Sequence, residues 1–296
     1  KEVGERLRDV LRSAGNFVYA KPKIMGIMNV TPDSFSDGGS FFVGGKIDGV
    51  RVMKRVEQMI DEGADIIDVG GESTGPGSKD VSVKEELARV RPVFEIFSKK
   101  KILKKVSLSV DTWKSPVARM AIEHGASIVN DVTALRGDKK MASVIAELNV
   151  LTVMMYSKDT TARTSRELTP YDDVMEAVIS FLETRVAYAV SKGISRDRLI
   201  LDPGMGAFVS GYPKYSLEIL RRLGELKIFG LPLLVGPSRK SFIPGKLEER
   251  HEGGVASAVL AYEHGASMLR MHDVRAARRA LDMAYSIVTN STSSGT

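Results

Sequence analysis

An arginine and a histidine stand two residues apart in the segment "SMLRMHD" near the end of the chain. Arg270 and His272 would point to one side of an extended strand, and Leu269 and Met271 to the other, because side chains alternate along a strand. A guanidinium and an imidazole that converge on one place are typical of an oxyanion site, and of a phosphate site in particular. An ion pair at the surface is the alternative interpretation of the same segment.

Other apolar, strand-like runs also end in polar residues, among them the hydroxyl-rich "GGEST" (residues 70–74) and "PSRKS" (residues 237–241). The single polar residues at such ends are Asn29, Asp111, Asn130, Asp131 and Asp202. Helix N-capping explains a few of these positions, and we interpret Asp131, Ser115 and Asp273 as caps. Capping does not explain polar residues at seven of eight ends, which indicates that these ends form a site.

The acids Asp111 and Asp202 allow two kinds of chemistry. They could act as an acid and base pair, or each could accept two parallel N–H bonds from a flat ligand. With Asn130 beside them, the set suits a heterocycle that carries both donors and acceptors. Zinc-type motifs such as HxH and HExxH are absent from the chain, whereas Mg²⁺ needs few protein ligands and stays compatible with a phosphorylated substrate.

The elements that would position these residues alternate between apolar strands and amphipathic helices. The repeated segments "DEGAD" and "EHGAS" each lie between a helical pattern and an apolar run, which indicates a helix stopped by a left-handed glycine and then a buried strand. The histidines of the two "EHG" segments, His124 and His264, are therefore predicted to be structural. The eight expected strands are Lys23–Val30, Asp65–Gly70, Val106–Asp111, Ser127–Asp131, Leu151–Met155, Leu199–Asp202, Pro232–Gly236 and Ser267–His272.

Eight such units in about 250 residues predict an α/β fold, a (β/α)₈ TIM barrel, whose active sites lie at the C-terminal ends of the strands. A doubly wound open sheet is the alternative, but the GxGxxG fingerprint that it would carry after its first strand is absent. We expect an N-terminal helical extension over residues 1–22, the barrel over residues 23–288, and a polar, disordered tail over residues 289–296.

Composition narrows the possible partners. The chain has 296 residues, no cysteine and a formal charge of +6. The densest basic segment, "KKKILKK", is interpreted as a solvated helix end, so no nucleic-acid partner is expected. The chain contains no apolar run long enough to span a membrane, and the expected location is cytoplasmic.

The motifs taken together resemble those of the dihydropteroate synthase family, in the same order. They are "IMGIMNVTPDSFSDGG", "GADIIDVGGEST", "SVDT", "IVNDV", "LILDPGMG", "LPLLVGPSRKSF" and "RMHDV". The match runs from about Lys23 to Ile287. It implies a (β/α)₈ barrel that joins p-aminobenzoate to 7,8-dihydropterin-6-ylmethyl diphosphate, releasing 7,8-dihydropteroate and diphosphate in folate biosynthesis.

The resemblance also implies roles for individual residues. The pterin would be held by Asp111, Asn130, Asp202 and Lys240. The diphosphate would be held by Asn29, Thr74, Arg270 and His272, with Mg²⁺ near Asn29. The p-aminobenzoate pocket would be formed by Thr31, Pro32, Phe35, Pro76 and Ser238, with Arg239 near the carboxylate. Asp111, Asp202, Lys240, Arg270 and His272 would carry the catalysis, and the resemblance suggests a homodimer.

The chain departs from the family pattern in three places. Gly75 stands where the family has an arginine after "GEST", and Met155 stands where it has a histidine. The segment "DPGMGAFVSG" puts Ala207 and Val209 where an aromatic residue and a lysine are usual. This last pattern, with "TTARTS" upstream, is similar to the sulfonamide-insensitive branch of the family, so the departures concern the p-aminobenzoate pocket.

Three other functions are compatible with parts of the pattern. A pterin-binding methyltransferase domain that works with a corrinoid partner would share the carboxylates and Asn130, but it would not need the anion site. A catalytically silent pterin-binding barrel is suggested by Gly75 and Val209. A Schiff-base aldolase could use Lys240.

Overall fold

A computed structural model of the chain describes residues 20–31, 41–44, 46–100 and 102–290. Nearly all of the expected N-terminal helix and the end of the polar tail lie outside these residues. Within them, no helix combines the length and the apolar character needed to cross a membrane.

Eight parallel strands form one sheet in the order β8-β7-β6-β5-β4-β1-β10-β9. They are β1 (Lys23–Asn29), β4 (Ile66–Gly70), β5 (Ser107–Asp111), β6 (Ile128–Asp131), β7 (Leu151–Met155), β8 (Leu199–Asp202), β9 (Leu234–Val235) and β10 (Met268–Met271). A bridge between Leu201 and Leu233 joins β8 to the segment before β9 and closes the sheet. All eight expected strands are found, so the prediction of a (β/α)₈ barrel is confirmed.

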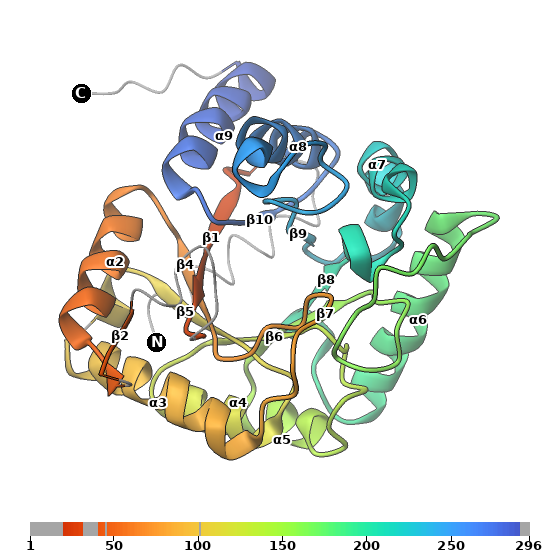
Figure 1. The fold of residues 1–296 in the computed structure, drawn as a ribbon. Coiled ribbons are helices and arrows are strands. Elements are labelled where there is room, and N and C mark those ends of the chain that lie inside the picture. The colour runs from red at the N-terminus through yellow and green to blue at the C-terminus, as the bar shows by residue number, and fades with distance from the viewer. Residues whose placement is uncertain (1–19, 32–40, 45, 101, 291–296) are drawn as a thin grey trace.

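Eight helices among the described residues surround the strands in chain order (Figure 1). They are α2 (Gly49–Asp61), α3 (Val83–Lys99), α4 (Ser115–Glu123), α5 (Met141–Leu148), α6 (Val174–Ser191), α7 (Pro213–Arg222), α8 (His251–Glu263) and α9 (Val274–Thr289). A short hairpin, β2 (Phe42–Val43) with β3 (Lys46–Ile47), precedes α2.

The repeated "GA" segments end α2, α4 and α8 in one and the same way. Gly63, Gly125 and Gly265 have φ values of 97°, 103° and 113°, a conformation that glycine adopts without the steric cost of a side chain. His124 and His264 lie at the ends of α4 and α8, and the Nδ1 of each is within hydrogen-bond distance of a backbone carbonyl. The prediction that both are structural is confirmed.

Of the three predicted helix caps, only Asp273 is one, since its side chain accepts from the backbone N–H of Ala276 at the start of α9. Asp131 instead accepts from the N–H groups of Thr133 and Leu135 and holds a tight turn after β6. Ser115 is the first helical residue of α4 and not its cap. Those two predictions were wrong, because a polar residue at a strand end can bond to a turn as well as to a helix.

The inner face of the barrel has an apolar floor and a polar rim. The floor is one cluster made of Met25, Ile66, Ile128, Leu151, Val153, Ile200, Leu234 and Met268. Two residues further along their strands, on the same face, lie Asp68, Asn130, Asp202 and Arg270. The residues between them, such as Leu269 and Val129, pack outwards under the helices. The strand period therefore places the polar groups together at the C-terminal mouth.

Candidate functional site

Arg270 joins two carboxylates across the barrel mouth. Its Nε donates to Asp68 Oδ2 at 2.7 Å, and its Nη2 donates to Asp111 Oδ2 at 2.7 Å. Asn130 Nδ2 donates to the same Asp68 oxygen at 3.0 Å. Three of the predicted site residues, Arg270, Asp111 and Asn130, are thus brought into one hydrogen-bonded group.

Asp68 at the centre of this group was missed in the sequence. It is completely buried in β4, and its Oδ1 is buried without a partner. An ionised carboxylate in such a place is tolerated only when it is paired, and Arg270 supplies the pairing. The signal that could have found it is one acid on the inward side of the otherwise apolar strand "IIDVG".

Asp202 and Lys240 also lie at the barrel mouth. Together with Asp111, Asn130 and Arg270 they form a ring of polar side chains. Asp202 is buried at the end of β8 and accepts from the backbone N–H of Gly204 at 2.8 Å. Lys240 lies over the ring of Phe208, with Nζ 4.8 Å from the ring centre. Arg239, the residue before Lys240, has a left-handed backbone conformation with a φ of 58°. The charge of Lys240 acts on Asp202 and Asp111, and the charge of Arg239 acts on His272.

The acids and the lysine of the ring have pKa values close to neutrality. Desolvation raises the pKa of Asp111 to about 7, against the lowering effect of Arg270. Burial raises the pKa of Asp202 to about 6, although Gly204 and Lys240 oppose it. Desolvation and the charge of Arg270 lower the pKa of Lys240 to about 8. Groups that carry such perturbed pKa values in one place are typical of functional sites.

His272 is a neutral neighbour of the cation Arg270. Desolvation, followed by the charges of Arg239 and Arg270, lowers its pKa to about 3, so the imidazole is neutral at physiological pH. Ser238 Oγ accepts from the backbone N–H of His272 at 3.2 Å and lies 3.0 Å from His272 Nδ1. A hydroxyl that accepts one bond and donates its own proton to Nδ1 leaves the ring proton on Nε2. His272 can therefore offer a neutral N–H donor.

The remaining predicted residues lie around this ring or outside the described part of the chain. Asn29 ends β1, and Thr31 follows it and is buried. Thr74 and Pro76 lie on the loop between β4 and α3, where the Thr74 carbonyl accepts from the N–H of Thr164 at 3.2 Å. Pro32 and Phe35 lie outside the described residues.

Two of the residues that depart from the family pattern, Met155 and Val209, are buried in apolar clusters. Met155 and Phe208 form a small cluster with Val132 and Ala162, and Trp113 packs against it. Val209 is fully buried in the main core. The mouth of the barrel is thus covered on the β7–β8 side by apolar side chains and by the β7–α6 loop, which contains Ala162.

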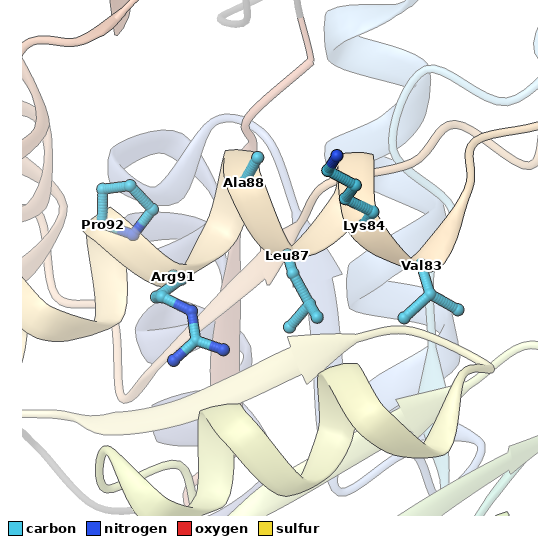
Figure 2. Close-up of a pocket in the computed structure, with 6 residues that line it drawn as sticks. All are labelled: Val83, Lys84, Leu87, Ala88, Arg91 and Pro92. Atoms are coloured by element: carbon cyan, nitrogen blue, oxygen red, sulfur yellow. The ribbon is translucent and has the colours of Figure 1, made fainter.

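A separate shallow hollow lies on the surface of α3 (Figure 2). It is lined by Val83, Lys84, Leu87, Ala88, Arg91 and Pro92. All six residues belong to one helix, and the hollow contains none of the carboxylates of the barrel mouth. The barrel mouth is therefore the candidate functional site.

Within the described ranges, no group of three or more His, Cys, Asp or Glu side chains is arranged to hold a metal ion.

Comparisons with known proteins identify the family of the chain. The model of the pterin binding enzyme family matches residues 25–272. The dihydropteroate synthase of Clostridium beijerinckii is 42% identical over 273 residues, 90% of this chain and 94% of that one. The Bacillus subtilis dihydropteroate synthase is 42% identical over 267 residues, 89% of this chain and 87% of that one.

Solved structures of the same kind superpose on the barrel. The Yersinia pestis dihydropteroate synthase in a sulfonamide drug complex has a TM-score of 0.83 at 35% identity, covering 91% of this chain and 95% of that one. The Xanthomonas albilineans dihydropteroate synthase with 4-aminobenzoic acid has a TM-score of 0.80 at 38% identity, covering 95% of this chain and 98% of that one. With a family model that spans most of the chain and relatives of this identity, the chain belongs to the pterin-binding enzyme family, among the dihydropteroate synthases.

Proposed function

We propose that the chain condenses p-aminobenzoate with 7,8-dihydropterin-6-ylmethyl diphosphate to give 7,8-dihydropteroate and diphosphate. The observation that carries the proposal is the ring of Asp111, Asn130, Asp202, Lys240 and Arg270 at the barrel mouth, in a chain of this family. The ring offers acceptors to a flat N–H edge and cations to an anion, and the pterin diphosphate carries both.

The reaction breaks the C–O bond between the pterin methylene and the diphosphate, and the electron pair leaves with the diphosphate. The lone pair of the p-aminobenzoate amine forms the new C–N bond, and the amine then loses a proton to solvent. The amine is nucleophilic without a strong base, so the site must orient the two substrates and stabilise charge. The carboxylates of Asp111 and Asp202, when ionised, favour the positive charge that develops on the pterin methylene.

The departing diphosphate would receive a charge-assisted bond from Arg270 and a neutral bond from His272. His272 cannot supply charge, because its pKa is about 3. With the Ser238 hydroxyl donating to Nδ1, the ring proton would be on Nε2, and Nε2–H would be a preorganised donor that needs no proton transfer. Thr74 would add a hydroxyl donor from the β4–α3 loop.

Two substitutions of His272 separate the roles of its nitrogens. His272→Gln keeps a donor near the place of Nε2 and is expected to retain kcat/KM within about tenfold. His272→Asn places its amide near Nδ1 and should lower kcat/KM about a hundredfold. Steady-state kinetics of the two variants, with nitrogen NMR of the His272 tautomer, check this. Equal losses in both variants would contradict the assignment of Nε2–H as the donor.

Mg²⁺ is proposed as a partner of the diphosphate. The donor set near it fits, because Asn29 offers an uncharged amide oxygen and Mg²⁺ commonly takes few protein ligands together with substrate phosphates. Asn29 Oδ1 lies on the inner side of the barrel, 3.6 Å from the place that a Cβ of Gly70 would occupy. When bound, the ion would supply positive charge to the leaving diphosphate.

A homodimer is also proposed, and its support is a set of exposed apolar side chains on neighbouring helices. Leu217 on α7, Leu260 on α8 and Ile287 on α9 are 54%, 48% and 67% exposed. Analytical ultracentrifugation tests the dimer, and a chain that sediments as a monomer at micromolar concentration would contradict it. The cytoplasmic location stays a prediction.

A diphosphate-release assay tests the function. Purified protein with p-aminobenzoate, the pterin diphosphate and Mg²⁺ should release one diphosphate for each dihydropteroate formed, and a sulfonamide included as a competitor reports on the p-aminobenzoate pocket. Binding of the pterin without release of either product would instead favour the catalytically silent barrel.

A further inference from the structure

The β7–α6 loop reaches across the mouth and is bonded to the β4–α3 loop, which carries Thr74 and Pro76. Arg163 Nη2 donates to Glu72 Oε1 and, at 2.7 Å, to the backbone carbonyl of Lys79, and its Nη1 pairs with Asp80. Thr164 adds a backbone bond to the Thr74 carbonyl. Arg163 therefore holds the start and the far end of the β4–α3 loop at the same time.

Glu72 is a well-positioned partner for Arg163 because Lys114 and Trp113 hold its carboxylate in place. Its side chain is 3% exposed and accepts from Lys114 Nζ at 2.6 Å and from Trp113 Nε1 at 3.0 Å. Lys114 also pairs with the fully buried Glu86 at 2.5 Å. Burial raises the pKa of Glu72, but Lys114 and Arg163 together bring it below its usual value. Two carboxylates share Lys114, so Arg163 supplies the second cation of the cluster.

The tip of the β4–α3 loop has no side-chain anchor of its own at position 75. A Cβ built on Gly75 would meet only Ser73 Oγ, at 3.8 Å, so the space around it is open. The β7–α6 loop is anchored in turn, because Ala162 is buried against Phe208 and Thr164 Oγ1 donates to the Ala207 carbonyl at 2.8 Å. The contacts of the β7–α6 loop therefore add to the bonds that the β4–α3 loop already makes, such as Ser78 Oγ to the Gly75 carbonyl and Arg89 Nη1 to the Gly71 carbonyl.

We propose that Arg163 is a positioning residue for the p-aminobenzoate pocket. It acts by holding the β4–α3 loop, and with it Pro76 and Thr74, against the β7–α6 loop. The inference rests on the proposed function for the identity of the second substrate. The bond between the two loops is independent of that function and can be measured without turnover.

The test compares Arg163→Met with Arg163→Lys and with a matched control, Arg166→Met, which removes an exposed arginine three residues along the same loop. Hydrogen exchange of residues 71–82 should become at least about tenfold faster in Arg163→Met and should be unchanged in the control, because the lost bonds are the ones that oppose local opening. The KM for p-aminobenzoate should rise about tenfold or more, while the Kd of the pterin diphosphate stays within about twofold. Arg163→Lys keeps one cation for Glu72 and should recover a large part of both losses.

Unchanged exchange of residues 71–82 in Arg163→Met would overturn the proposal. So would equal losses in kcat, p-aminobenzoate KM and pterin affinity with a lower melting temperature, since a general loss of structure would then explain them. A failure of the proposed function is distinguishable from both, because the wild-type protein would then release no diphosphate while the exchange difference persists.

Discussion

Replacing Arg270 with glutamine is expected to lower kcat/KM about a thousandfold and to destabilise the fold by about 3–5 kcal/mol. The activity falls because the departing diphosphate loses its charged donor. The stability falls because Asp68, fully buried, and Asp111 both lose the guanidinium that pairs them. Kinetics with the pterin diphosphate and urea unfolding at pH 7.5 measure the two effects separately.

A double variant separates the structural part of this loss from the catalytic part. Asp68→Asn removes the buried charge but keeps an oxygen that can accept from Asn130. Adding it to Arg270→Gln should recover about half or more of the lost stability and none of the activity. Near-normal turnover of Arg270→Gln would contradict its assignment to the anion site, and a double variant no more stable than the single one would contradict the pairing with Asp68.

Replacing Asp202 with asparagine is expected to stabilise the fold at pH 7.5 and to impair binding of the pterin. The pKa of Asp202 in the folded chain is about 6, above its ordinary value of 3.8. The buried carboxyl therefore favours the fold only while it is protonated, and ionisation costs about 3 kcal/mol above pH 6. Asparagine carries no charge and keeps the bond from the Gly204 N–H, so the melting temperature should rise by about 5 °C or more.

The pH dependence checks the cause of this gain. The advantage of Asp202→Asn should shrink as the pH falls through 6 and vanish below about pH 3, where the wild-type carboxyl is protonated in both the folded and the unfolded chain. Asp61→Asn, on the exposed end of α2, is the control and should change neither stability nor activity. A less stable Asp202→Asn at pH 7.5 would contradict the account.

The same substitution should raise the Kd of the pterin diphosphate about a hundredfold, because an amide N–H₂ would meet the N–H edge of the ring where an acceptor is needed. Calorimetric titration of the pterin diphosphate measures this. A gain in stability with a loss of binding at one residue is the trade-off expected where function keeps a charge in an unfavourable place.

The barrel could be predicted from the sequence because its signals are local and repeated. Apolar runs such as "DIIDVGG" recur along the chain, and glycines end several of the helices before them. These signals bounded all eight strands to within two residues at either end. The two wrong caps show where this stops, since Asp131 is at a strand end but bonds to its own turn.

The part of the site at strand ends could be predicted from the positions of its residues, and Lys240 from the "PSRKS" motif. Asp111, Asn130, Asp202 and Arg270 share that position, and the fold brings such positions together. Asp68 was not predicted as a site residue because it lies inside strand β4 and not at its end. Arg163 was not predicted because its partners Glu72 and Asp80 are 91 and 83 residues away in the sequence. The contact joins two loops, and loops have no periodic pattern from which such a contact could be predicted. The neutral state of His272 depends on three-dimensional burial and on neighbouring arginines from other elements.

The bond between Arg270 and Asp111 has a consequence for selectivity and for turnover. On the proposed function, the group that meets the diphosphate and a group that meets the pterin are joined to each other in the free barrel. A pterin that takes Asp111 from Arg270, or a diphosphate that takes Arg270 from Asp111, would leave one charge of the pair without its partner. The intact conjugate compensates both charges at once, which favours it over either fragment. Once the conjugate has been cleaved, the re-forming ion pair competes with both products and assists their departure.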